Sequence, residues 1–127
     1  MASSDNVLRG GLTPKHIDVS ELLSILDFEE RPVTTLGAEK ILETEKAYPN
    51  FADEFVLSVV SVKKGLAHIS PAIRNVEILL CTDGRATLSN FDSGIDIRKG
   101  MSVIIPAAAG SYNIKGHAIF YKSSVPV

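Results

Sequence analysis

Two cations and one acid lie close together near the start of this 127-residue sequence. Asp5, Arg9 and Lys15 fall in a stretch rich in serine, glycine and proline, which predicts a loop. An arginine suits contact with an oxyanion, because its guanidinium stays charged and offers paired donors in a fixed geometry. Two structural alternatives stand beside this interpretation: Asp5 could cap the loop as an Asx turn, and Lys15 could pair with a neighbouring side chain.

A second pattern consists of two spacings, Glu-x6-Gly over residues 77–84 and Gly-x5-Pro over residues 100–106. It resembles the two cupin motifs, in which glycines turn the hairpins of a jelly-roll barrel and histidines with a glutamate bind a metal inside it. The histidines are missing, because residues 70–73 read Ser-Pro-Ala-Ile and Ser111 stands at the last histidine position. One glutamate cannot bind a metal. The resemblance implies a metal-free barrel, unless both spacings are accidents of hairpin geometry in an all-β chain.

The remaining groups that could do chemistry stand alone in the sequence. His16, His68 and His117 have no histidine, cysteine or carboxylate at ligand spacing, which favours structural or surface roles. Cys81 is the only cysteine and lies in an apolar run, so an inert core thiol is favoured over a nucleophile. A single cysteine excludes an internal disulfide and fits a reducing, cytoplasmic location. Neither a phosphate-binding glycine loop nor a Ser-His-Asp elbow sequence is present.

These residues must be positioned by a mainly β chain with one short helix. Asp18 and Glu21 form a capping-box pattern ahead of an apolar face, which predicts a helix over residues 18–27. The acidic connection that follows contains only a weak extended candidate around Ile41 and Leu42. Runs of β-branched and aromatic residues then predict strands at 55–62, 76–81, 86–91, 95–97, 102–105 and 118–121. Short strands at this spacing indicate a sandwich, jelly roll or barrel.

Glycine-containing pairs predict the turns between these strands. The Asp-Gly pair at 83–84 supplies the positive φ that a tight hairpin needs, and the Ser-Gly pair at 93–94 does the same one strand later. The Lys-Gly pair at 99–100 ends the next strand. Each predicted turn is therefore set by local sequence.

Composition limits the classes of protein to which the chain can belong. With 45% hydrophobic and 22% charged residues it can bury the core of one globular domain. The net charge is −2, and the lysines and arginines are scattered, which argues against nucleic-acid binding. No apolar run approaches the roughly 20 residues that a membrane-spanning helix needs, so no membrane partner is expected.

The stretch SSDNVLRGGLTPK at residues 3–15, followed by IDV at 17–19, closely resembles the SDNVxRAGLTPKxxDVxxL signature of type I mannose-6-phosphate isomerases. The one departure is Gly10, where the family commonly has alanine. The chain resembles the C-terminal domain of that family along its length. This implies that residues 1–16 are the tail of a catalytic domain, and that 17–127 form a cupin-type jelly-roll barrel (a double-stranded β-helix) that includes the short helix.

The family's enzymes are zinc-dependent isomerases that interconvert mannose 6-phosphate and fructose 6-phosphate through an enediol. The resemblance implies that Arg9 stabilises negative charge on the enediol oxygens, that Asp5 assists ring opening or proton shuttling, and that Lys15 binds the sugar or its phosphate. The family's zinc ligands would precede residue 1. We therefore expect no metal in this chain, a missing N-terminal catalytic domain as its partner, and no isomerase activity from the isolated chain.

Two other interpretations stay open. In the first, the chain is a freestanding, non-catalytic cupin that binds a sugar or sugar phosphate, with Arg9 and Lys15 as the anion contacts. In the second, it is a structural barrel that buries an interface, with a homodimer as one form. Replacing Arg9 and Lys15 with alanine would weaken binding in the first case and change nothing in the second.

Overall fold

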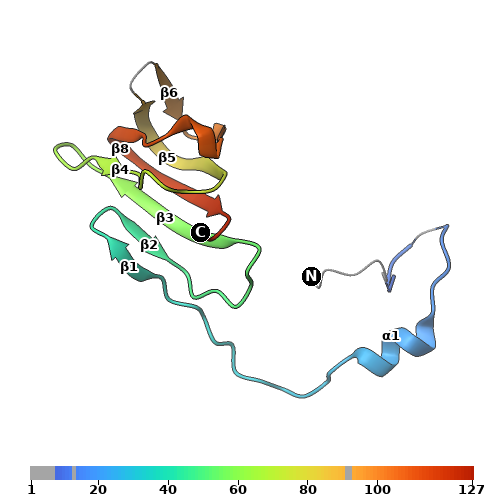
Figure 1. Cartoon of the computed structure of the whole chain (residues 1–127). Coiled ribbons are helices and arrows are strands. Elements are labelled where there is room, and N and C mark those ends of the chain that lie inside the picture. The colour runs from blue at the N-terminus through green and yellow to red at the C-terminus, as the bar shows by residue number, and fades with distance from the viewer. Residues whose placement is uncertain (1–7, 13, 91–92) are drawn as a thin grey trace. The chain divides into compact units, whose positions relative to one another are not determined.

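The computed structural model describes residues 8–12, 14–90 and 93–127, and the chain divides into two compact units, residues 1–34 and 35–127. Each unit has its own local structure (Figure 1). Among the described residues, the first unit contains one short helix and the second contains all the strands. The sequence-based domain boundary between residues 16 and 17 stays a prediction.

The helix of the first unit is α1, which spans Val19–Ile25 within the predicted range of 18–27. It begins where expected, because the side chain of Asp18 accepts a hydrogen bond of 3.0 Å from the backbone N–H of Glu21. It ends at Leu26, whose backbone is extended. None of its residues is buried, and the side chains of Val19, Leu23 and Ile25 are each more than half exposed.

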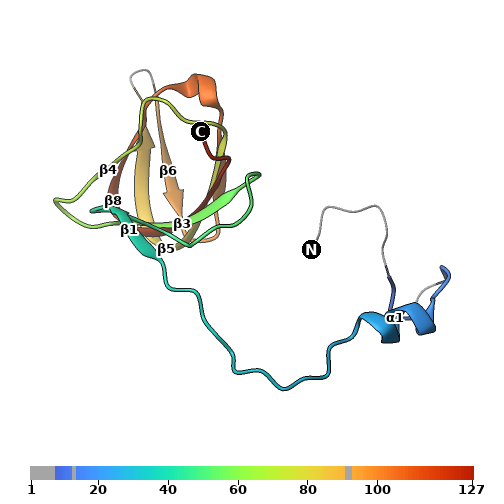
Figure 2. The same cartoon turned by 60° about the horizontal axis from the view of Figure 1, so that its bottom comes forward.

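The second unit is built from strands that curve around a common interior (Figure 2). The strands are β1 (Glu39–Leu42), β2 (Glu45–Ala47), β3 (Val56–Val62), β4 (His68–Ile69), β5 (Glu77–Ser89), β6 (Gly94–Arg98), β7 (Ser102–Ile105) and β8 (Asn113–Ser124). All pairings are antiparallel, in the order β1-β2-β3-β8-β5-β6, with β4 added to β8 and β7 to β5. A short 3-10 turn, η1 (Ala107–Ala109), precedes β8. The mainly β, cupin-type fold predicted from the sequence is confirmed.

One predicted hairpin is wrong. The Asp-Gly pair at 83–84 does not turn the chain, because β5 continues through it from Glu77 to Ser89 and pairs with β8 along almost its whole length. The register instead shifts between Cys81 and Asp83, which marks a β-bulge, and Gly84 has φ of +74° there. The two expected strands 76–81 and 86–91 are therefore one bent strand.

The weak extended candidate at residues 41–42 is a strand. Together, β1 and β2 form a hairpin that adds to β3 and so extends the sheet at one edge. Sequence reasoning treated this acidic segment mostly as surface connection, since its strands are short and only its second strand turns a side chain into the interior, at Glu45.

Alternate residues of the long strands fill the barrel interior. The buried apolar core comprises Val60, Val62, Leu79, Cys81, Ala86, Ile97, Ile105, Tyr112, Ile114, Ala118 and Phe120. Cys81 is fully buried, and burial raises the pKa of its thiol, which confirms the inert core interpretation. The same interior also holds several charged side chains.

Candidate functional site

The loop that carries the predicted catalytic residues lies in the first unit. Arg9 is half-buried and Lys15 is exposed, whereas Asp5 lies outside the described residues. A Cβ placed on Gly10 would lie 3.2 Å from Cδ2 of Leu22, so the loop beside Arg9 approaches α1 closely. The roles of Asp5, Arg9 and Lys15 stay predictions.

A cluster of buried charged groups occupies the barrel interior at Glu77, the glutamate of the cupin-like spacing. The Nζ of Lys122 lies 3.2 Å from Oε1 of Glu77 and 2.6 Å from Oε1 of Glu45. These three side chains come from β8, β5 and β2 and are all less than one-tenth exposed. An ammonium ion therefore bridges two carboxylates inside the barrel. We call Glu45, Glu77 and Lys122 the ionic cluster.

Two neighbouring side chains, Ser58 and Arg74, contact the carboxylates of the ionic cluster. The Ser58 hydroxyl donates to Oε1 of Glu45 at 2.6 Å. Arg74 lies with Nη1 3.7 Å from Oε2 of Glu77, and its guanidinium donates to the carbonyls of Pro106 and Gly110 at 3.1 Å and 2.8 Å from Nη2. A buried charge costs on the order of several kcal/mol unless it is paired and hydrogen-bonded in this way.

His68 is fully buried beside the ionic cluster. Its Nδ1 shares a hydrogen bond of 2.9 Å with Oγ1 of Thr44, and its Nε2 lies 3.9 Å from Oε2 of Glu45. Burial lowers the pKa of His68, and the attraction of the Glu45 carboxylate opposes that shift only in part. His68 is therefore a core histidine, which confirms the structural role favoured from the sequence, and His16 and His117 are exposed.

Three buried polar atoms around the cluster have no hydrogen-bond partner among the described residues: Nε2 of His68, Oε2 of Glu77 and the hydroxyl of Tyr112. Burial and then the carboxylate of Glu77 raise the pKa of Tyr112, so its phenol stays protonated. The guanidinium of Arg74 lies 5.1 Å from the centre of the Tyr112 ring, a cation–π distance.

Two of the positions compared with the cupin histidines are occupied by serines, Ser70 and Ser111, which lie close together. Oγ of Ser111 donates to the carbonyl of Ser70 at 2.8 Å, and the backbone N–H of Tyr112 donates to Oγ of Ser70 at 2.9 Å. Ser70 and Ser111, two of the residues at the cupin histidine positions, therefore lie in contact. Hydroxyl groups here tie β4 to the start of β8 and are poor ligands for zinc.

The barrel interior does not fit a zinc ion. No three histidine, cysteine, aspartate or glutamate side chains converge as a ligand set within the described part of the chain. Where two carboxylates do meet, the ammonium of Lys122 already neutralises them. The cluster can bind strands β2, β5 and β8 together, and no chemical step is assigned to it.

Sequence reasoning missed Lys122 and Glu45. A signal for Lys122 exists in the alternation of β8, because Ala118, Phe120 and Lys122 share one face and the first two are core residues. No comparable signal exists for Glu45, which sits in a three-residue strand of an acidic segment.

Comparison with known proteins decides the family. Residues 44–125, which contain the whole ionic cluster, match the family described as mannose-6-phosphate isomerase, cupin domain. The chain belongs to this family. The mannose-6-phosphate isomerase of Escherichia coli K12 is 36% identical over 118 residues, which cover 92% of this chain and 30% of that enzyme. An Arabidopsis thaliana mannose-6-phosphate isomerase is 32% identical over 114 residues, covering 84% of this chain and 24% of its own length.

Solved structures of the family give the same result. Mannose 6-phosphate isomerase from Salmonella typhimurium, solved with bound substrate and zinc, superimposes with a TM-score of 0.81 at 29% identity, covering all of this chain and 32% of that enzyme. A zinc-bound form of mannose 6-phosphate isomerase gives 0.80 at 29% identity, covering 99% and 32%. The chain therefore spans about a third of the length of these relatives. Within its described residues, no helix has the length and apolarity to cross a membrane.

Proposed function

We propose that this chain is the C-terminal part of a zinc-dependent mannose-6-phosphate isomerase, which interconverts mannose 6-phosphate and fructose 6-phosphate through an enediol. The observation that carries the proposal is the extent of the match to the E. coli enzyme, which covers 92% of this chain but 30% of that enzyme. The rest of the catalytic machinery, including zinc, would come from the remaining part of the enzyme. A cytoplasmic location fits the single buried thiol.

Within this function, Arg9 would stabilise negative charge on the enediol oxygens, Asp5 would assist ring opening or proton shuttling, and Lys15 would bind the sugar or its phosphate. The guanidinium can do this because it stays charged and presents paired donors. Residues 1–16 would be the tail of the catalytic domain and residues 17–127 the second barrel with its helix.

The exposed surface of the first unit supports this proposal. The side chains of Val19, Leu23 and Ile25 on α1 are each more than half exposed, as is Phe28. A helix gains most of its stability in proteins from burying an apolar face, so an uncovered face of this kind indicates that another stretch of polypeptide packs on it. The part of the enzyme that this chain does not span would provide that cover and would place Arg9 at the substrate.

A chimera tests the proposal. This chain would replace the matching C-terminal third of the E. coli enzyme, and isomerisation of fructose 6-phosphate would be measured with and without zinc. We expect zinc-dependent activity that falls by roughly a hundredfold or more in Arg9→Ala, since loss of one group that stabilises transition-state charge costs that order of rate. Arg31→Ala, at an exposed arginine paired with Asp27, is the matched control and should keep activity. A folded, zinc-loaded chimera without activity would contradict the proposal.

The isolated 127-residue chain provides the second arm of the test. It should not isomerise sugar phosphates, with or without added zinc, because removing the metal and the base takes away on the order of several kcal/mol of barrier lowering each. Turnover by the purified chain, stimulated by zinc, would show that the chain is an enzyme by itself.

A further inference from the structure

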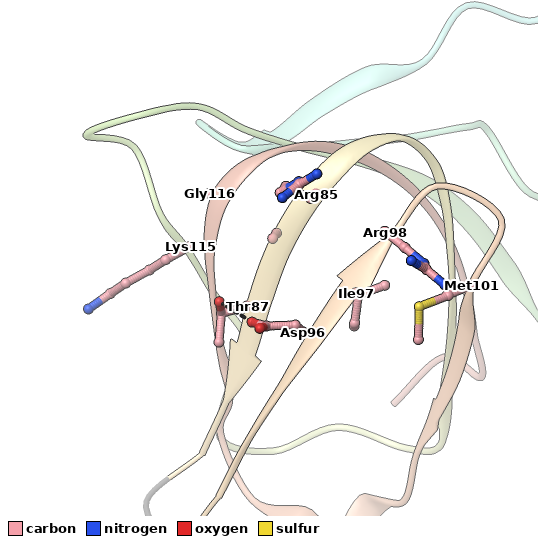
Figure 3. A pocket seen from close by; sticks show the side chains of 9 residues that line it. Arg85, Thr87, Asp96, Ile97, Arg98, Met101, Lys115 and Gly116 are labelled. Atoms are coloured by element: carbon pink, nitrogen blue, oxygen red, sulfur yellow. Dashed lines mark hydrogen bonds between the residues drawn. The ribbon is translucent and has the colours of Figure 1, made fainter.

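A cleft of about 680 Å³ opens on strands β5, β6 and β8 of the barrel, and none of its lining residues belongs to the ionic cluster (Figure 3). Its charged and polar lining includes Arg85, Arg98, Thr87 and Asp96. All the lining residues belong to the second unit, so the cleft can be judged independently of the proposed isomerase function. We call it the arginine cleft.

Sheet register explains how the two arginines come to share the cleft. Arg85 on β5 is the direct cross-strand partner of Arg98 on β6, and the next exposed pair along is Thr87 with Asp96. The intervening pair, Ala86 and Ile97, is buried, so both arginines project from the exposed face of the sheet. Cα atoms of directly opposed residues lie roughly 4.5–5.5 Å apart, which brings both guanidinium groups within reach of one anion.

Ion pairing within the described residues leaves both arginines without a carboxylate partner. No ion pair within residues 8–12, 14–90 and 93–127 involves Arg85 or Arg98, whereas the exposed Arg31 is paired with Asp27. The nearest acid of the cleft is Asp96, and one of its oxygens accepts a hydrogen bond of 2.7 Å from the Thr87 hydroxyl (Figure 3). Like charges placed directly opposite one another destabilise a sheet, and an anion bound between the two arginines would relieve that repulsion.

The rest of the lining indicates how large the anion is. Met101, which is 39% exposed, gives the cleft its apolar part beside Arg98, and a volume of about 680 Å³ exceeds what one inorganic phosphate fills. Pockets of roughly 300–1,000 Å³ accommodate small organic ligands. Lys115 also lines the cleft, but its ammonium points away from the arginines in Figure 3.

We propose that the arginine cleft binds a small phosphate monoester, with Arg85 and Arg98 holding the phosphate oxygens and the apolar part contacting the organic group. Phosphate suits two guanidinium groups because each can donate a pair of parallel hydrogen bonds to its oxygens.

Titration of the full chain followed by amide NMR tests the proposal. Inorganic phosphate, a sugar phosphate and an aryl phosphate would each be added at constant ionic strength, with sodium chloride as the reference salt. Saturable shifts should appear at residues 85–87 and 96–98, and the monoesters should bind more tightly than inorganic phosphate. Shifts that do not saturate, or that chloride reproduces, would overturn the proposal, and equal affinity for phosphate and both monoesters would overturn the role of the apolar part.

Single substitutions provide the second test. Arg85→Gln and Arg98→Gln should each weaken monoester binding by about tenfold or more, the effect of losing one charge-assisted contact. Arg31→Gln removes the same charge outside the cleft and should bind as the wild type does. Arg85→Lys keeps the charge but loses the paired donors, so its affinity for the monoester should lie between those of the wild type and Arg85→Gln. Because both arginines are exposed, the variants should keep the wild-type amide spectrum, and wild-type affinity in both Gln variants would overturn the proposal.

Discussion

The two units of the chain distribute apolar and charged side chains in opposite ways. In residues 1–34, the apolar side chains of α1 are exposed, and the ion pairs that Arg31 makes with Asp27 and Glu29 lie at the surface. In residues 35–127, the charged groups of the ionic cluster, Glu45, Glu77 and Lys122, are buried beside the apolar core. An exposed apolar helix face favours packing against another stretch of polypeptide, whereas the charges of the ionic cluster pair with one another inside the barrel.

One chain can therefore combine a unit that is stabilised by its own buried core with a unit whose exposed apolar residues suit packing against another polypeptide. Exposed ion pairs contribute about 0–1 kcal/mol, so those of Arg31 cannot hold the first unit together. Buried pairs are costly to break because the remaining charge has no water around it. Stability should therefore depend on single residues in the barrel far more than in the first unit.

Lys122→Met should have the largest effect of the substitutions considered. It leaves the carboxylates of Glu45 and Glu77 buried without their shared ammonium, and removing one partner of a buried pair costs about 3–5 kcal/mol. The free energy of unfolding in urea would measure this. Lys46→Met, at an exposed position of the same strand as Glu45, should change it by less than about 0.5 kcal/mol. Equal stability of the two variants would show that the cluster does not hold the barrel.

A pair of leucine substitutions compares the two units directly. Leu79 is fully buried in β5, so Leu79→Ala should lower the free energy of unfolding by about 2–5 kcal/mol. Leu23 on α1 is 55% exposed, so Leu23→Ala should change it by less than about 0.5 kcal/mol in the isolated chain. In the chimera with the E. coli enzyme, the same Leu23→Ala should become destabilising, if that enzyme covers α1. An unchanged chimera would show that α1 is exposed there too.

Most of the fold could be predicted from local sequence. The strand around β3, the hairpin between β5 and β6 and the capped start of α1 all follow from patterns within a few residues. The Asp-Gly pair at 83–84 led to a wrong prediction of a hairpin turn. Glycine is required at position 84 for a different reason, because a Cβ there would lie 2.1 Å from the carbonyl oxygen of His117 on β8. The need for glycine was real, but its cause was the close approach of a strand that lies far away in sequence.

The interior could not be predicted to the same extent. The cupin-like spacing identified Glu77 and Ser111, yet the cation that Glu77 contacts comes from β8 and the second carboxylate from β2. Sheet topology decides which side chains from distant parts of the sequence come into contact, and a single sequence carries little information on sheet topology. The same limit explains why His68 looked isolated although it lies 3.9 Å from Glu45.

The smallest expected effect is a change in the stability of the barrel with pH, caused by His68. Burial lowers the pKa of His68 below the ordinary value of 6.5, with Glu45 and Glu77 opposing the shift and Lys122 adding to it. Below about pH 6.5 the unfolded chain therefore binds a proton at His68 that the folded barrel does not bind. The free energy of unfolding should then fall as the pH drops toward about 5.5, by at most about 1.4 kcal/mol per pH unit.

His68→Gln should flatten the stability curve between about pH 7 and 5.5, roughly the window in which an unfolded histidine takes up its proton. The exposed His117 is the matched control, because His117→Gln removes a histidine from the surface of β8 and should keep the wild-type slope. Urea unfolding at half-unit pH steps measures both. If His68→Gln retained the wild-type slope, protonation of the buried imidazole would not be what weakens the barrel.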